Sequence, residues 1–378
     1  MRNLRTVATL FWVAFASLCL LGCNQTQVAF QETDVPRLST WGLMDANGKS
    51  FTLSENVLPY QLNSTLFTDY AHKLRTVTLP LGLSATANQD GTINFPVGTI
   101  LSKTFFYPRS SSQLLKSDDK GSHFTNTIGS HGGIDLSHVT LIETRLLVHR
   151  QSGWVALPYV WNDEQTEATL EITGDAKVLR IKDETQQYDF TYIVPDKNQC
   201  AGCHGTNATT RDINPIGPRI NNLNRNYDYH TAAVNQLEHW QNLGLIQLDS
   251  SPENLPAMAD WADSGVDIES RARAYLDVNC AHCHNEKGPA DTSGLFLDIA
   301  TENLTRLGVC KLPIAAGQGT GGNKYSIVPG KPDKSILVYR MQAEDPGAMM
   351  PELGRSLAHP EGISLIEDWV ASLQGECG

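Results

Sequence analysis

The sequence predicts a multidomain α+β chain, in which an N-terminal antiparallel β-sandwich or barrel-like domain precedes two mainly α-helical domains. Three observations support this fold class. Runs rich in valine, isoleucine, threonine and aromatic residues fill the first half, helical periodicity replaces them near residue 198, and the motif Cys-x-x-Cys-His occurs twice after that point. A length of 378 residues is enough for two or three domains.

Composition and charge narrow the class of protein. Forty per cent of the residues are hydrophobic and 19 % are charged, as in ordinary globular chains. Acidic residues outnumber basic ones by 41 to 29, which gives a formal net charge of -12. Because a nucleic-acid binder must neutralise phosphates with basic side chains, we expect no nucleic-acid partner.

The first 22 residues read as an export signal. Arg2 and Arg5 precede an almost entirely apolar stretch, 6–22, which ends at a polar run. The sequence Leu-Leu-Gly-Cys that ends at Cys23 resembles a bacterial lipobox, which implies lipid on the Cys23 sulfur. The alternative is a plain signal peptide followed by an incidental cysteine.

Residues 23–40 are then a polar tether, so the membrane is contacted through the lipid anchor only. Asn24 is not the aspartate that usually retains lipoproteins at the inner membrane. We therefore expect an exported, periplasm-facing lipoprotein, with the outer membrane favoured.

A β-rich domain is predicted over residues 41–195. Its strand-like runs are separated by turn signals at 151–153 and 174–175. Short strands at such spacing are typical of sandwiches and barrels. The runs are 77–79, 98–107, 139–150, 154–161 and 169–173.

Four cysteines form two copies of one motif. These are Cys200 and Cys203 followed by His204, and Cys280 and Cys283 followed by His284. Cys-x-x-Cys-His is the attachment signature of c-type haem. Thiols three residues apart lie near one face of a helical turn and can reach two vinyl groups, and the next histidine becomes an axial iron ligand. The sequence therefore predicts two covalently bound haem c groups.

Two other interpretations of the cysteine pairs remain. A zinc ribbon places its pairs about 15–20 residues apart, far closer than these, and does not explain the two histidines. A thioredoxin-like redox motif needs a βαβ setting, which neither pair has.

The second haem domain is predicted over residues 263–378. A helical pattern at 268–276 runs into Cys280, and an apolar stripe at 363–373 predicts a closing helix with Pro360 near its first turn. This part resembles a class I cytochrome c. The resemblance implies a methionine as sixth iron ligand, with Met350 before proline as first choice. Met349 and Met341 are alternatives, and core packing is the ordinary role of any methionine.

The first haem domain is predicted over residues 196–262. Strand-like residues precede Cys200, so no entry helix is expected. Residues 214–219 resemble the Gly-Pro segment of class I cytochromes, which implies a backbone carbonyl that orients His204. Met258 is the candidate sixth ligand of this haem. The alternatives left open are His230, His239, Met44 and a histidine of the β domain.

Cys310 and Cys377 are the other cysteines that follow Cys23. In an oxidising compartment they are candidates for a disulfide, and the alternative is two free thiols.

With both motifs placed, the chain from residue 23 onwards resembles an uncharacterised family of bacterial di-haem c-type cytochromes with an N-terminal β domain. The resemblance implies two covalent haems and electron transfer with redox partner proteins of the cell envelope. The resemblance rests on five short segments, which are residues 95–99, 143–147, 158–161, 214–218 and 271–276.

The favoured function is thus an electron carrier of the periplasm or outer membrane, and not an enzyme. One alternative is a di-haem enzyme such as a peroxidase, which would turn over peroxide. Another is an electron-transfer subunit that docks a dehydrogenase through its β domain.

Overall fold

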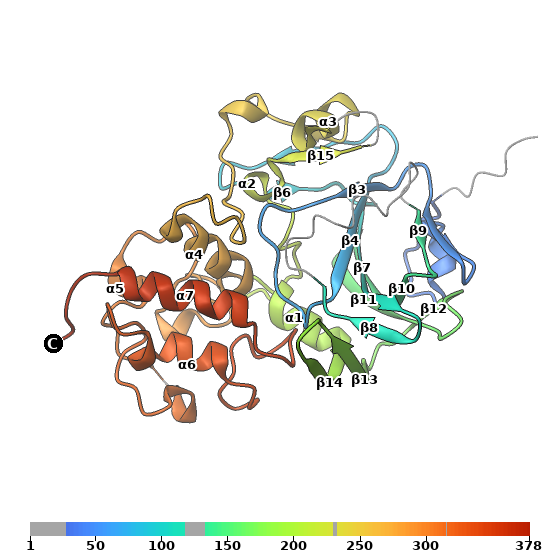
Figure 1. Ribbon diagram of the computed structural model, residues 1–378. Helices are drawn as coiled ribbons and strands as arrows, with labels where there is room; N and C mark the ends of the chain where they lie inside the picture. The colour runs from blue at the N-terminus through green and yellow to red at the C-terminus, as the bar shows by residue number, and fades with distance from the viewer. Residues whose placement is uncertain (1–27, 118–132, 230–232, 315) are drawn as a thin grey trace, which may run out of the picture.

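The computed structural model describes residues 28–117, 133–229, 233–314 and 316–378 (Figure 1). Within these described residues, strands account for 28 % and helices for 22 %, and one curled sheet dominates. The structure does not contain two mainly α-helical cytochrome domains, so that part of the predicted fold class is wrong. The prediction failed because the segment after the first motif packs on the sheet and does not form a helical domain of its own.

The large sheet is built around β7 (Ile100–Ser110). This strand pairs antiparallel with β10 (Val139–Arg150) on one side and with β4 (His72–Thr78) on the other. The pairing of β7 with β10 shifts by one residue between Leu141 and Glu143, a β-bulge. The remaining strands are β3 (Leu58–Tyr60), β8 (Gln113–Leu115), β11 (Gly153–Trp161), β12 (Ala168–Leu170), β13 (Asp175–Lys182) and β14 (Gln187–Val194).

Three small sheets surround the large one. The first has the order β1-β2-β9, the second pairs β15 with β16, and the third has the order β17-β5-β6. Their strands are β1 (Met44–Ala46), β2 (Ser50–Leu53), β5 (Ala85–Ala87), β6 (Ile93–Asn94), β9 (Ile134–Asp135), β15 (Asn226–Asp228), β16 (Ala233–Asn235) and β17 (Ile246–Gln247).

The α-helices of the described residues all follow the large sheet in the chain. In Figure 1, α1 lies between the sheet and the group that contains α4, α6 and α7. Asp267 caps α4 by accepting from the amide of Ser270, and Pro360 opens α7. The helices are α1 (Lys197–His204), α2 (Ile220–Leu223), α3 (Gln236–Asn242), α4 (Ile268–Leu276), α5 (Leu304–Leu307), α6 (Ile336–Gln342) and α7 (Pro360–Ser372).

Both faces of the central strands of the large sheet are covered by cores. Ile100 and Leu146 belong to the core on one face, together with the fully buried Trp41. Leu101, the next residue of β7, points to the opposite face and packs in a different core. This second core also contains Trp240 of α3, so residues from both sides of the first motif share it.

The segment 196–262 is therefore not a separate helical domain. Its strand β17 pairs in parallel with β5 of the N-terminal part. Trp240 is fully buried and meets Tyr60 of β3 edge-on, with ring centroids 5.7 Å apart. A segment with helices of four to eight residues cannot cover a haem by itself, and it uses the sheet as its other wall.

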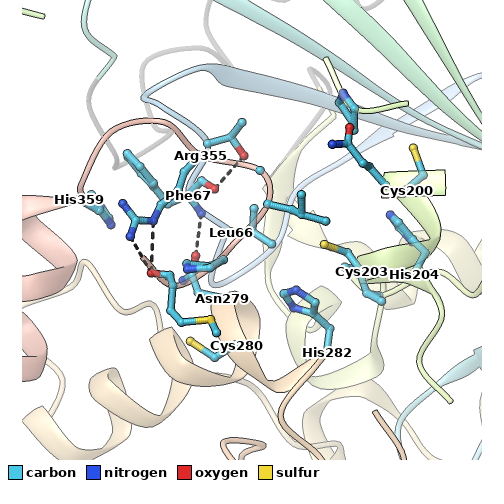
Figure 2. Close-up of a pocket in the computed structure, with 18 of the residues that line it drawn as sticks. Leu66, Phe67, Cys200, Cys203, His204, Asn279, Cys280, His282, Arg355 and His359 are labelled. Atoms are coloured by element: carbon cyan, nitrogen blue, oxygen red, sulfur yellow. Dashed lines mark hydrogen bonds between the residues drawn. The ribbon is translucent and has the colours of Figure 1, made fainter. Parts of the chain in front are cut away.

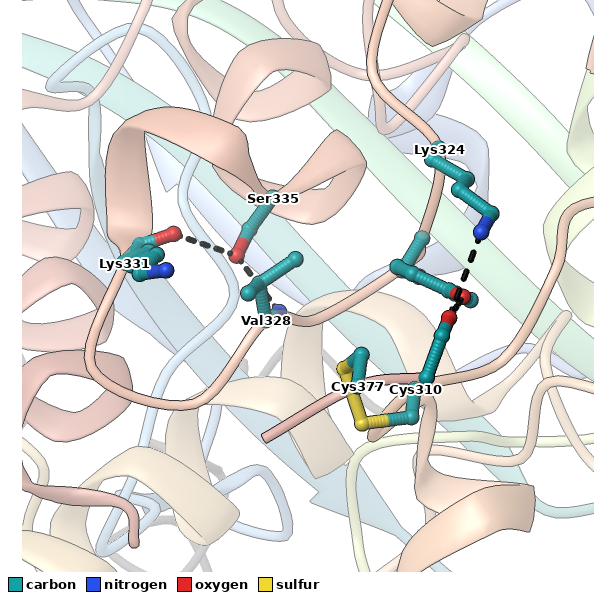
Figure 3. Close-up of a disulfide and its surroundings, with 8 residues drawn as sticks. Cys310, Lys324, Val328, Lys331, Ser335 and Cys377 are labelled. Carbon is teal, nitrogen blue, oxygen red and sulfur yellow. Dashed lines mark hydrogen bonds between the residues drawn. A yellow bond between two sulfur atoms is a disulfide. The ribbon is translucent and has the colours of Figure 1, made fainter. Parts of the chain in front are cut away.

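The C-terminal segment, 263–378, has a core of its own. Tyr275 of α4, Leu337 of α6 and Trp369 of α7 pack together in it. A disulfide joins Cys310 to Cys377 and ties the loop after α5 to the end of the chain (Figure 3).

Candidate functional site

The first motif lies on α1, directly after the sheet. Strand β14 ends at Val194, and Asp196 begins the helix with a capping box completed by Gln199. No entry helix precedes Cys200, as the sequence indicated. The helix ends at His204, where the amide of Gly205 bonds to the carbonyl of Ala201 at 2.8 Å.

His204 is held in one orientation. Its Nδ1 lies 2.8 Å from the backbone carbonyl of Asn214, and because a carbonyl can only accept, Nδ1 carries the proton. Burial lowers the pKa of His204 to about 3. The ring is therefore neutral and its Nε2 is left as the lone-pair nitrogen, which is the form that binds iron.

The second motif lies at the end of α4. The helix continues into a π-helical turn, η3 (Asp277–Ala281), which contains Cys280. The backbone carbonyl of His284 accepts from Leu297 at 2.8 Å, and its Nδ1 lies 3.4 Å from Ser293 Oγ. Burial lowers the pKa of His284, so this imidazole is also neutral.

The two motifs touch each other. The Cys283 thiol lies 3.7 Å from the carbonyl of Gly202, inside the first motif. Just beyond the motifs, the amide of Ala208 donates to the carbonyl of Lys287 at 2.7 Å. The chain thus brings together two cysteine pairs that are far apart in the sequence.

A cavity of about 650 Å³ lies beside the first motif. Binding cavities for small molecules and cofactors usually measure about 300–1,000 Å³. One wall is formed by Cys200, His204 and residues 214–219, and the other comes from the strands of the large sheet. The sheet contributes Tyr60, Arg75, Leu101, Lys103, Arg145, Leu147 and Trp154, among others.

A second, smaller cavity, of about 80 Å³, lies between the two motifs and shares lining residues with the larger one (Figure 2). Cys280, Tyr275 and Met350 line it together with Leu66 and Phe67 from the loop between β3 and β4. The N-terminal part therefore supplies walls to the surroundings of both motifs.

Several hydrogen bonds fix that loop against the C-terminal segment. The amide of Phe67 donates to Asn279 Oδ1 at 2.9 Å, one residue before Cys280. The buried carboxylate of Asp69 accepts from the amides of Ser356 and Leu357, both at 2.8 Å. The Phe67 ring stacks on His359 with centroids 4.1 Å apart.

The environments of the four motif thiols disfavour the thiolate form. None of these thiols is in a disulfide, in contrast to Cys310 and Cys377. Burial raises the pKa of Cys200 to about 11 and that of Cys280 to about 12, and it also raises the pKa values of Cys203 and Cys283. Since redox-active thiols have lowered pKa values, the environment disfavours a thioredoxin-like role.

No group of three or more histidine, cysteine, aspartate or glutamate side chains is arranged to hold a metal ion within the described ranges. A structural zinc site takes four such ligands and a catalytic one three, so the described residues give the zinc interpretation no support. Haem iron takes only axial ligands from the protein, so the haem interpretation is not tested by it.

The methionine candidates are placed differently. Met350 and Met341 line the cavity that borders Cys280, whereas the buried Met349 does not. The buried Arg355 donates to the Met350 carbonyl from Nε at 3.2 Å and from Nη2 at 2.9 Å, which anchors the loop that carries Met350.

The structure does not bring Met258 to the first motif. Met258 is buried, its amide donates to the carbonyl of Asn221 at 2.7 Å, and it lines neither of the two cavities. Met44 packs in the core on the far face of the sheet, and His239 stacks on Tyr229.

Sequence reasoning missed three residues that face the first motif. Lys103, Arg145 and His282 line both cavities. Burial lowers the pKa of His282 to about 4, and Figure 2 shows its ring toward the first motif. The available signals were a charged residue within each of two apolar strands and a histidine inside the second motif.

Several predictions concern residues outside the described ranges. These are the export signal 1–22, the lipid anchor Cys23 and the candidate ligand His230. No helix in the described part of the chain is long and apolar enough to span a membrane.

No family model, no curated protein and no solved structure matches this chain. The resemblance to di-haem cytochromes thus stays a prediction made from the motifs and phrases of the sequence.

Proposed function

We propose that this chain is a di-haem c-type cytochrome that transfers electrons in the cell envelope. The observation that carries the proposal is the contact between the two Cys-x-x-Cys-His motifs, at Cys283 and Gly202. Two unrelated cysteine pairs have no reason to meet. Two haems that exchange electrons must lie close to each other, and the attachment motifs are the residues that fix their separation.

The residues at the first motif fit a haem. Cys200 and Cys203 are free thiols for the covalent bonds, and His204 presents Nε2 as the axial nitrogen. The carbonyl of Asn214 accepts from Nδ1, which keeps the ring oriented and makes the ligand more basic. The sheet supplies the wall that the short helices lack, and this is the role we assign to the N-terminal part.

The donor residues at the second motif also fit, and its cavity of about 80 Å³ would have to widen to admit the group. Cys280 and Cys283 are the attachment thiols, His284 is the axial imidazole, and the Met350 thioether is the sixth ligand. A thioether favours ferrous iron and raises the potential. Bound haem supplies reversible one-electron chemistry, and the protein's contribution is to orient its ligands and exclude water.

The location follows from the N-terminal sequence. Residues 1–22 direct export, and Cys23 carries the lipid that holds the protein at a membrane, with the outer membrane favoured. The partners are redox proteins of the envelope. The full chain has a net charge of -12, which becomes 27 − 41 = -14 when Arg2 and Arg5 leave with the signal, and an acidic surface suits partners with basic docking faces.

The test is to produce the full chain in a bacterium that attaches c-type haem and to measure the haem-to-protein ratio after extraction in acidic acetone. We expect two haems that resist extraction. The pair of substitutions Cys280→Ala and Cys283→Ala should leave one. The matched control, Cys310→Ala with Cys377→Ala, removes two cysteines outside the motifs and should leave both haems.

Folded, full-length protein without covalent haem would refute the proposal. The carrier role is tested separately, because an electron carrier is reduced and reoxidised reversibly. Rapid oxidation of a dye by peroxide would instead assign the protein to the di-haem enzymes.

A further inference from the structure

Three cationic side chains form a row across the middle of the large sheet. Arg75 on β4 lies directly opposite Lys103 on β7, and Lys103 lies directly opposite Arg145 on β10. Residues opposite each other on adjacent strands project to the same face. Like charges in such positions repel each other, so the row is costly unless an anion lies against it.

One carboxylate, that of Glu143, forms an ion pair with a member of the row. Glu143 accepts from Arg145 Nε at 2.7 Å and from Nη2 at 2.5 Å, so it neutralises Arg145. Arg75, only 7 % exposed, donates to the backbone carbonyl of Lys73 at 3.5 Å. In the described part of the chain, neither Arg75 nor Lys103 has an ion pair with a carboxylate.

Lys103 is the least compensated member of the row. Its Nζ lies 5.3 Å from the centroid of the Phe105 ring, a weak interaction for a half-buried ammonium. Burial and the two arginines lower its pKa to about 7. The charged form of this side chain therefore needs a negative partner.

The row faces the first motif. Arg75, Lys103 and Arg145 all line the cavity of about 650 Å³ that Cys200 and His204 border. Asp90, Asp277 and Asp298 line the same cavity, and each already has a partner of its own; Asp298 accepts from the hydroxyl of Thr301 at 2.8 Å. Asp277 lies 3.6 Å from Arg219, and Asp90 accepts from the hydroxyl of Thr92 at 2.6 Å.

We propose that Arg75, Lys103 and Arg145 form an anion-binding site that takes carboxylate groups beside the first motif. Two sources have this chemistry, namely the propionate side chains of a haem attached at Cys200 and Cys203, and a small free carboxylate. The inference rests on the proposed function for the first source and on the cavity and its charges for the second.

The test compares Lys103→Gln, which removes the charge, with Lys103→Arg, which keeps it. Lys177→Gln is the matched control, because Lys177 lies on strand β13 and pairs with Asp175 away from the cavity. Arg75→Gln is the second variant. The readout is the midpoint potential of the first haem, identified as the one lost in the variant Cys200→Ala with Cys203→Ala.

A positive charge near haem stabilises the reduced state, so its loss lowers the potential. At a fixed applied potential, we expect Lys103→Gln to lower the ratio of reduced to oxidised first haem about tenfold. For one electron, this corresponds to a midpoint potential lowered by about 59 mV. Arg75→Gln should also lower the midpoint potential. Lys103→Arg and Lys177→Gln should leave it unchanged.

Acetate, titrated at constant ionic strength, distinguishes the sources. A lowered potential in Lys103→Gln with no response of the wild type to acetate identifies the propionates. A wild-type response that Lys103→Gln lacks identifies a free carboxylate. The thermal unfolding midpoint is also measured at increasing acetate concentration. This readout tests the row in protein without haem.

Two results would overturn the anion site. One is an unchanged potential in Lys103→Gln together with no acetate response. The other is a change of iron spin state in both Lys103→Gln and Lys103→Arg, because Lys103 would then be an iron ligand. The haem-to-protein ratio separates these outcomes from failure of the proposed function, since two attached haems with an unchanged potential refute the row alone.

Discussion

Replacing Glu143 by glutamine removes the carboxylate that neutralises Arg145 in the sheet. The Glu143 side chain is fully buried, and it also accepts from Tyr192 at 2.6 Å. Breaking a buried ion pair on one side costs about 3–5 kcal/mol, because the remaining charge is left uncompensated. Since the amide oxygen of glutamine can keep one of these hydrogen bonds, we expect a loss of about 3 kcal/mol.

The measurement is urea unfolding followed by far-UV circular dichroism. With a slope of about 3 kcal/mol/M, the midpoint should fall by about 1 M. The control is Asp189→Asn, which breaks a pair with Arg180 whose side chains are 55 % and 63 % exposed. Such exposed pairs contribute little to stability, so the midpoint of this control should stay close to that of the wild type.

A compensating variant sharpens the test. Lys103 repels Arg145 across the strands, so Glu143→Gln combined with Lys103→Met should be more stable than Glu143→Gln alone. If Glu143→Gln matched Asp189→Asn, or if the added Lys103→Met recovered nothing, the charge balance described for the row would be wrong.

Three further predictions concern other parts of the chain. Removing the Cys310–Cys377 bridge, which closes a sequence separation of 67, should destabilise the protein by about 4 kcal/mol of loop entropy, read from the unfolding midpoint with and without reductant. Burial raises the pKa of Asp69 from 3.8 to about 6, so between pH 4 and 6 the folded state binds more protons than the unfolded state and stability falls as the pH rises, by about 3 kcal/mol. Asp69→Asn should lose this slope in unfolding curves recorded across that range, and an unchanged slope would contradict the assignment. Met350→Ala should abolish the near-infrared charge-transfer band of a ferric haem with a thioether ligand, whereas Met349→Ala should keep it.

Local patterns predicted individual elements well. Strand β10 occupies the predicted range, Val139–Arg150, and α4 and α7 lie where the apolar stripes placed them. Each of these elements is long enough for its periodicity to identify it. The carbonyl expected near His204 also follows from a local segment, and it belongs to Asn214.

The arrangement of the segments could not be predicted in the same way. The boundary proposed at residue 195 followed a real change in the sequence, from strands to helices. Nothing local indicates that β17 pairs with β5, or that Trp240 packs in a core with Leu101. Such contacts depend on the whole chain, so the predicted independent helical domain was wrong.

The cation row shows the same limit at the candidate site. Arg75, Lys103 and Arg145 are ordinary surface residues when each strand is taken alone. Their alignment depends on the register of β4, β7 and β10, which includes the bulge next to Glu143. Register is a property of the assembled sheet, and a shift of one residue would turn a side chain to the opposite face.

The pairing of β17 with β5 also has a consequence for synthesis of the chain. The ribosome makes the large sheet first, yet the core that contains Leu101 lacks Trp240 until much later. During that interval an apolar face stays open to solvent, which slows folding and invites aggregation.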